Sequence, residues 1–220
     1  YIHYKERIIM SKTHLFEQVA AKKIIPVVKL DRVSDAKPLG EALCKGGLPV
    51  AEVTFRTEAA EESIRIMRKE FPEMMVGAGT VLNVEQARRA LDAGATFLVA
   101  PGFCRSVVEF AIDNHLPVFP GTCTPSEVMA AMEYNLSVVK FFPALQYGGL
   151  GTIKALAAPF PSLKFMPTGG INASNVLEFL AFDKVIACGG SWMVKDSLIN
   201  EGNFEEIARL TAEAVTLVSR

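Results

Sequence analysis

The chain has 220 residues, half of them apolar, and a formal net charge of −1. This length suits one large α/β domain with a substantial packed core. The near-neutral charge gives no support for nucleic acid or an anionic membrane as a partner. No apolar run reaches the roughly 20 residues that a membrane-spanning helix needs.

The chain opens with "YIHYKERIIM", which carries charges and lacks the apolar region of a signal peptide. Met10, followed by "SKTHLFEQ", is a candidate start residue. We therefore predict that residues 1–10 are an extension, native or vector-derived, and that residues 11–220 form a single domain in the cytoplasm. The segment Ser11–Lys22 has the pattern of an extra N-terminal helix, which we expect to cover the bottom of the fold.

From Ile24 onward, short β-type runs alternate with amphipathic helical patterns such as Asn83–Ala95. Candidate N-caps precede several of these helices. In chain order the runs are Ile24–Leu30, Val50–Phe55, Met74–Thr80, Thr96–Pro101, Pro117–Gly121, Val138–Pro143, Lys164–Gly170 and Val185–Ser191. The N-cap candidates are Ser34, Asn83, Ser106, Thr124 and Ser174.

Eight strand–helix units predict an α/β fold, and specifically a (β/α)8 TIM barrel. The competing architecture is an open doubly wound sheet, which would show a glycine-rich dinucleotide fingerprint after its first strand. No such fingerprint follows the run "IIPVV". The barrel is therefore the favoured fold, with its site at the carboxyl ends of the strands.

Polar residues interrupt two of the apolar runs. Glu52, Thr54 and Arg56 occupy alternate positions of the second run and so share one face, which we expect to point inward. By the same alternation Lys140 and Phe142 share a face of the sixth run. These two strands lie on opposite sides of an eight-stranded ring, so we expect Glu52 and Lys140 to face each other across the width of a small substrate.

Lys140 stands in the apolar stretch "VVKFFPA". One interpretation is a lysine whose stem packs on the strand while its amine reaches solvent. The favoured interpretation is a Schiff-base nucleophile, because desolvation by apolar neighbours disfavours the ammonium form. Glu52 is either a partner of a nearby cation or a general base. Arg56 is either a solvated charge or a fork for a substrate carboxylate.

Glycine-rich turns follow three of the predicted strands, at Gly77–Thr80, Pro167–Gly170 and Cys188–Ser191. The turns after the seventh and eighth strands are where such barrels bind phosphate. Ordinary βα turns are the alternative. Asn172 and Ser174 are interpreted as caps of the next helix, and Trp192 as a packing residue.

The cysteines are scattered without a Cys-x-x-Cys pair, which predicts reduced thiols. Of the three histidines, His3 and His14 lie near the start and His115 in a turn. No residue spacing suggests a metal site, and we expect neither a metal nor a cofactor. The cysteines are Cys44, Cys104, Cys123 and Cys188.

The sequence resembles the aldolases that act on 2-keto-3-deoxy-6-phosphogluconate (KDPG) and 2-keto-4-hydroxyglutarate (KHG). The resemblance runs in order over almost the whole chain from Ile24. It implies a class I aldolase on a TIM barrel, usually a homotrimer, that cleaves phosphorylated KDPG to pyruvate and glyceraldehyde 3-phosphate in the Entner–Doudoroff pathway. The motifs that carry it are "EVTFRT", "VGAGTVLN", "APGF", "FPGTCTPSE", "KFFPA", "PTGGI" and "CGGSW".

The resemblance also implies roles for individual residues. Lys140 would carry the Schiff base and Glu52 would transfer protons. The related galactonate-type aldolases lack the "RT" that follows the second strand here, which argues against their substrate specificity for this chain. By the resemblance, Arg56 and Thr80 would hold the pyruvyl carboxylate, Pro101 and Phe142 would line the pocket, and Thr168, Gly169, Gly170 and Ser191 would bind the phosphate.

Three other functions stay open at this stage. A barrel isomerase or synthase could use the same glycine turns, and a phosphosugar-binding protein could use them without catalysis. A metal-dependent aldolase is disfavoured by the lack of clustered histidines. The sequence does not rank KDPG against KHG as substrate.

Overall fold

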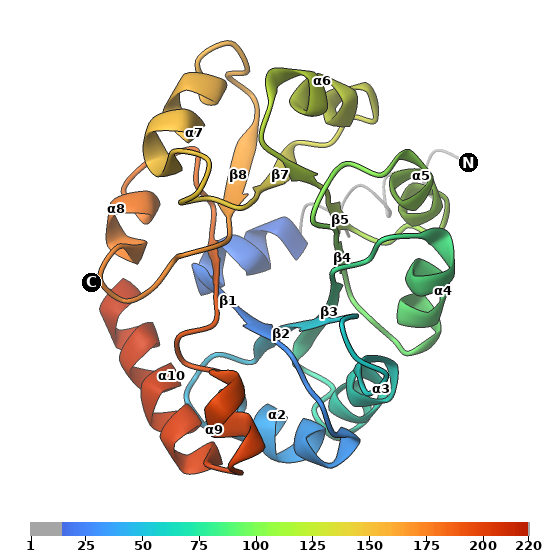
Figure 1. Ribbon diagram of the computed structural model, residues 1–220, viewed down its shortest axis with the longest axis vertical. Coiled ribbons are helices and arrows are strands. Elements are labelled where there is room, and N and C mark those ends of the chain that lie inside the picture. Colours follow the sequence, from blue (N-terminus) through green and yellow to red (C-terminus); the bar gives the residue numbers. More distant parts are fainter. Residues whose placement is uncertain (1–14, 220) are drawn as a thin grey trace.

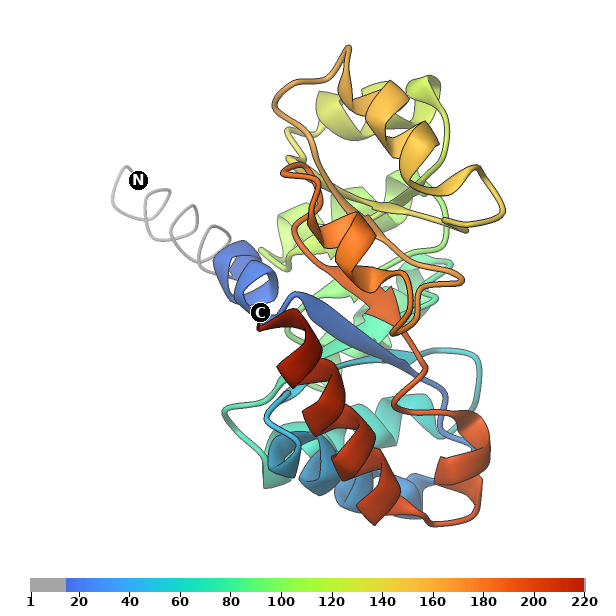
Figure 2. The same cartoon turned by 90° about the vertical axis from the view of Figure 1, so that its left-hand side faces the viewer.

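The computed structural model describes residues 15–219. The predicted extension 1–10 and the start of the predicted Ser11–Lys22 helix lie outside this part, whereas residues 15–22 are helical. The Phe16 ring packs edge-on against Phe119, with ring centroids 5.4 Å apart. Figure 2 shows the end of the last helix beside residues 15–22, where Lys23 Nζ donates to the Val218 carbonyl at 2.6 Å.

The strands are short and every pairing between them is parallel. The described chain contains β1 (Ile24–Val28), β2 (Val50–Thr54), β3 (Met75–Gly79), β4 (Leu98–Val99), β5 (Val118–Phe119), β6 (Gly121–Thr122), β7 (Val138–Phe141), β8 (Lys164–Pro167) and β9 (Cys188–Gly190).

These strands form two curled sheets, one of six strands in the order β5-β4-β3-β2-β1-β9 and one in the order β6-β7-β8. Pro120 alone separates β5 from β6, so the predicted run Pro117–Gly121 is divided there. Proline has no N–H to give to a ladder, which accounts for a break at this residue. Isolated parallel bridges, Thr168 to Gly189 and Phe165 to Val185, link the two sheets on the other side.

Helices cover the outside of the strands (Figure 1), with α10 packed against α2. None of the helices among residues 15–219 is both long and apolar enough to cross a membrane. The helices are η1 (Val33–Asp35, a 3-10 turn), α2 (Ala36–Lys45), α3 (Ala60–Glu70), α4 (Val84–Asp92), α5 (Arg105–Asp113), α6 (Pro125–Glu133), α7 (Gly149–Ala157), α8 (Val176–Leu180), α9 (Asp196–Asn200) and α10 (Phe204–Val218).

Two of the predicted N-caps are confirmed. The Asn83 side chain accepts from the Gln86 N–H, and Thr124 forms a capping box with Glu127. Asn203, which was not predicted, caps α10 in the same way.

Three predicted caps are wrong. Ser34 lies inside η1, Ser106 lies inside α5, and α8 begins after Asn175 rather than after Ser174. The hydroxyl of Ser174 instead donates to the side chain of Asn172 at 2.6 Å, within the turn that precedes α8.

Alternation along β2 sets up the site. Ala51 and Val53 belong to the apolar core, whereas Glu52 and Thr54 line a central cavity. All five residues of β2 are buried. The fold therefore points the polar side chains of Glu52 and Thr54 toward the cavity rather than into the apolar core.

Candidate active site

A cavity of about 420 Å³ lies at the carboxyl ends of the strands. Its walls come from strand ends and loops throughout the chain, as expected for a parallel α/β fold of this kind. The lining includes every residue to which the aldolase resemblance gave a role: Glu52, Arg56, Thr80, Pro101, Lys140, Phe142, Thr168, Gly169, Gly170 and Ser191.

Lys140 projects into this cavity from β7, where its backbone pairs with Gly121 on one side and Met166 on the other. The residue is only 5% exposed. Its Nζ lies 3.2 Å from Oε1 of Glu52 and 5.1 Å from the centroid of the Phe142 ring. Lys140 thus faces inward, and its amine is bound to a carboxylate rather than to solvent.

The expected separation between Glu52 and Lys140 is wrong. The two side chains do not face each other across the width of a substrate but form a direct ion pair. Both side chains are long enough to meet inside the cavity, and in a buried site each charge is stabilised by contact with its partner. A substrate must therefore bind beside the pair rather than between separated groups.

Glu52 is fully buried, and its second carboxylate oxygen, Oε2, has no hydrogen-bond partner within residues 15–219. Such an oxygen is costly in a folded protein unless it has a use, since buried polar groups are normally paired. Gly79 on the neighbouring strand makes room for the carboxylate, because a Cβ there would lie 2.3 Å from Oε1. The carboxylate is thus held in place with one oxygen available to accept a proton.

Arg56 and Thr80 lie at the ends of neighbouring strands on the same cavity wall. The Arg56 Nε donates to Oγ1 of Thr54 at 3.0 Å, and the residue is exposed. Thr80 has a φ of 55°, which non-glycine residues rarely adopt and which is frequent at functional sites. This wall offers a cation and a hydroxyl to an anionic group.

The opposite end of the cavity is built from glycines. Gly169 and Gly170 have φ values of 105° and 79°, a conformation that glycine adopts without strain. Thr168 Oγ1 is buried without a hydrogen-bond partner among the described residues, and Ser191 Oγ donates to the Val27 carbonyl at 2.8 Å. The cationic side chains that line the cavity are Arg56 and Lys140, and neither belongs to this glycine-rich part. An anion bound at the glycines would therefore be held by neutral hydrogen-bond donors.

The packing role predicted for Trp192 is confirmed, since it packs partly buried against the hydrophobic core. It also lines this cavity and a second one of about 570 Å³ against α10. In the sequence, the motif "CGGSW" places Trp192 next to a strand end, and this position was the signal that could have predicted its place in the cavity. Gly189 and Gly190, from the predicted glycine-rich turn Cys188–Ser191, also line the cavity. No role was predicted from the sequence for the lining residues Val27, Ile171 and Thr54.

Metal ligation finds no support in the described side chains: within residues 15–219 no three His, Cys, Asp or Glu residues are grouped so that they could hold an ion. The four cysteines are unpaired thiols, of which Cys188 is buried. Burial raises the pKa of the Cys188 thiol to about 12.

A site at the carboxyl ends of parallel strands that holds a buried amine beside a carboxylate suits an enzyme that forms a Schiff base with a carbonyl compound. The family model described as KDPG and KHG aldolase matches residues 15–210. The chain belongs to this family of carbon–carbon lyases.

Individual relatives agree with the family assignment. The chain is 45% identical to the 2-dehydro-3-deoxy-phosphogluconate aldolase of Treponema pallidum over 93% of its own length and 97% of the relative's. It is 42% identical to the KHG/KDPG aldolase of Escherichia coli K12, over 87% and 90%.

Among solved structures, a KDPG aldolase from Legionella pneumophila superposes with a TM-score of 0.86 at 38% identity, covering 89% of this chain and 95% of that one. That crystal structure holds pyruvate captured at low pH as a covalent carbinolamine intermediate.

Proposed function

We propose that the protein is a class I aldolase that cleaves KDPG to pyruvate and glyceraldehyde 3-phosphate, and KHG to pyruvate and glyoxylate. The observation that carries the proposal is the buried contact between Lys140 and Glu52 inside the cavity. Family membership supports it, as does the covalent carbinolamine of the Legionella relative.

In the first step Glu52 accepts a proton from the Lys140 ammonium through their 3.2 Å contact. Both groups become neutral, which a buried site favours. The free amine attacks the C2 carbonyl of the substrate and forms a carbinolamine. Loss of water, with proton transfer through Glu52, then gives the iminium ion.

The iminium is the electron sink for breaking the C3–C4 bond. As that bond breaks, its electron pair moves into an enamine, and the proton of the C4 hydroxyl passes to the Glu52 carboxylate. The aldehyde product leaves, and Glu52 returns the proton to C3. Water then hydrolyses the iminium, which releases pyruvate and restores the Lys140 amine.

Binding groups flank the reacting pair. Arg56 and Thr80 hold the substrate carboxylate, and Pro101 and Phe142 form the wall that keeps water from the imine. The phosphate is held at the glycine-rich end by Thr168, Gly169, Gly170 and Ser191. For Ser191, donating its hydroxyl proton to phosphate means releasing the Val27 carbonyl.

We also propose that the two sheets are parts of one (β/α)8 barrel. Counting β5 and β6 as a single strand broken at Pro120 gives eight strands, and the Thr168–Gly189 bridge joins the remaining edges. The helical residues 15–22 then form the extra N-terminal helix below the barrel, within a single domain from residue 11 to 220. Because the chain belongs to the KDPG and KHG aldolase family, we expect the protein to be a homotrimer located in the cytoplasm.

Borohydride reduction in the presence of pyruvate tests the function. We expect a covalent adduct on Lys140, found by mass spectrometry, and pyruvate release from KDPG and KHG that Lys140→Ala abolishes. An isomerase or synthase would retain activity in Lys140→Ala and form no imine with any keto acid. A binding protein would bind phosphate esters without releasing pyruvate.

A further inference from the structure

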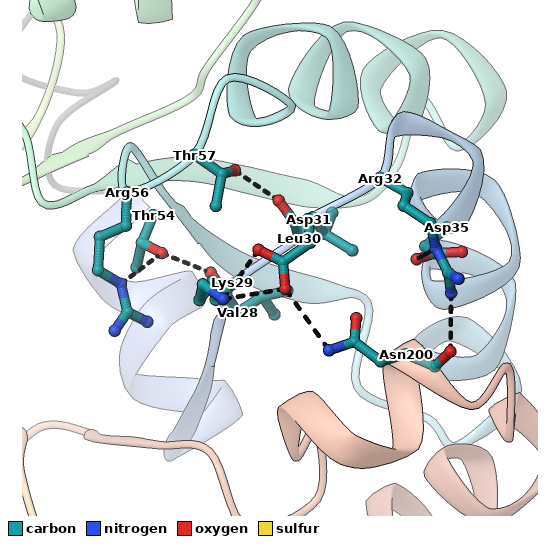
Figure 3. A network of polar contacts seen from close by, with 10 residues as sticks. All are labelled: Val28, Lys29, Leu30, Asp31, Arg32, Asp35, Thr54, Arg56, Thr57 and Asn200. Atoms are coloured by element: carbon teal, nitrogen blue, oxygen red, sulfur yellow. Dashed lines mark hydrogen bonds and ion pairs between the residues drawn. The ribbon is translucent and has the colours of Figure 1, made fainter.

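Two threonine side chains, at the end of β2 and just after it, hold this part of the chain against the end of β1 and the residues that follow (Figure 3). The backbone pairing of these strands reaches the pair Val28 and Val53. Beyond it, the Thr54 hydroxyl donates to the Val28 carbonyl at 2.9 Å, and the Thr57 hydroxyl donates to the Leu30 carbonyl. Side chains thus continue the contact that the backbone ladder no longer makes.

The Thr54 hydroxyl also accepts a hydrogen bond from Nε of Arg56 at 3.0 Å. Thr54 is 2% exposed, so water has little access to its hydroxyl group. Because the hydroxyl proton is engaged by Val28, its lone pairs are directed to other donors, and the neighbouring one is Arg56. Within the described residues this is the hydrogen bond that the Arg56 guanidinium makes.

We propose that Thr54 is a positioning residue for Arg56, an inference that rests on the proposed function. By binding Nε, Thr54 fixes the plane of the guanidinium and leaves both terminal nitrogens for a substrate carboxylate. The carboxylate is then bound end-on by these two nitrogens rather than side-on through Nε. The long arginine chain is ordered before the substrate arrives, which lowers the entropic cost of binding.

Three variants separate positioning from loss of structure. Thr54→Val keeps the shape of the side chain and removes the hydroxyl, whereas Thr54→Ser keeps the hydroxyl. Thr57→Val is the matched control, because it removes the neighbouring threonine–carbonyl contact without touching Arg56. Thermal unfolding of each variant reports any general loss of stability.

We expect Thr54→Val to raise the KM for KDPG about tenfold, as for loss of a hydrogen bond to a charged group, with kcat within about threefold of wild type. Thr54→Ser should restore the wild-type KM, and Thr57→Val should leave it within about twofold. An equal rise of KM in Thr57→Val would mean general loosening of the segment and would overturn the proposal.

A second readout does not depend on catalysis. In protein labelled with ¹⁵N-arginine, the Nε–H signal of Arg56 is assigned by its loss in Arg56→Lys. We expect its exchange with water to quicken about tenfold in Thr54→Val and to stay slow in Thr54→Ser and Thr57→Val. Unchanged exchange in Thr54→Val overturns the positioning role, whereas absence of an imine in the wild type overturns only the proposed function.

Discussion

Gly79 leaves the space that the Glu52 carboxylate fills. A Cβ at residue 79 would lie 2.3 Å from Oε1 of Glu52 and 2.6 Å from its Cγ. The two residues are on adjacent strands, where Gly79 pairs with Thr54 and Glu52 pairs with Gly77. The carboxylate can therefore lie next to Lys140 only because residue 79, on the neighbouring strand, has a hydrogen atom in place of a side chain.

Replacing Gly79 by alanine should displace Glu52 from the amine. Overpacking of this kind costs about 1–3 kcal/mol in a well-packed interior. We expect Gly79→Ala to lower kcat at least tenfold, since about 1.4 kcal/mol corresponds to a factor of ten. Steady-state kinetics of pyruvate release measure it.

Gly151→Ala is the control for this change. Gly151 lies in α7, and a Cβ there would meet no atom within 4 Å. Alanine is the better helix former, so this variant should keep wild-type kcat and gain up to about 1 kcal/mol of stability. Wild-type kcat in Gly79→Ala would show that the carboxylate has room to move without losing its function.

Removing one partner of the buried pair should destabilise the fold more than removing both. Lys140→Met leaves a buried carboxylate without its cation, which typically costs about 3–5 kcal/mol. The double variant Lys140→Met/Glu52→Gln should regain most of this loss. Urea unfolding of the three proteins measures the difference, and a Lys140→Met protein as stable as wild type would contradict it.

Acid should weaken the contact between α3 and α4. Hydrogen bonds from Arg89, and then from Arg65, hold the pKa of Glu61 below its usual range. A lowered pKa means that this carboxylate stabilises the fold above the ordinary glutamate value of about 4.3 and loses the effect as pH falls through the lower folded value.

Glu61→Gln should therefore lower the free energy of unfolding near pH 7, and the deficit should shrink as the pH falls toward 3. Urea unfolding at the two pH values measures this. Glu178→Gln, at an exposed carboxylate on α8, is the control and should change neither value. A Glu61→Gln deficit that is as large in acid as at neutral pH would contradict the assignment.

The cysteines should differ in reactivity. Burial raises the pKa of Cys188 to about 12, and burial also raises the pKa of Cys44 and of Cys123. Since the thiolate is the reacting form, Cys188 should be the slowest to be alkylated in native protein and should react readily in urea. Mass spectrometry after timed iodoacetamide treatment measures this. Native labelling of Cys188 as fast as that of Cys44 would contradict it.

Alternation along the strands predicted the candidate site well. A strand period of two was sufficient to turn Glu52, Thr54 and Lys140 inward, because their intervening neighbours are apolar. The glycine signals placed Gly169 and Gly170 at the other end of the same cavity. The resemblance to aldolases suggested roles for the lining residues whose function periodicity alone could not predict.

What depends on side-chain reach and on packing was not predictable. The contact between Glu52 and Lys140 follows from the lengths of two side chains and from the space at Gly79, neither of which appears in a pattern of polar and apolar residues. Ser106 is not a cap, because α5 begins one residue before it and Cys104 occupies the N-cap position. The cavity-lining position of Trp192 was not predicted, because a tryptophan that lines a cavity has the same sequence signal as one that only packs against a core.

The bond between Ser191 and the Val27 carbonyl joins residues 164 positions apart. Contacts of such long range form late, because a large loop must close before they contribute. A growing chain on the ribosome therefore cannot complete this cavity until its last strand has emerged. In refolding, recovery of pyruvate-releasing activity should lag behind the helical circular dichroism signal, so that activity reports when the last strand joins the cavity.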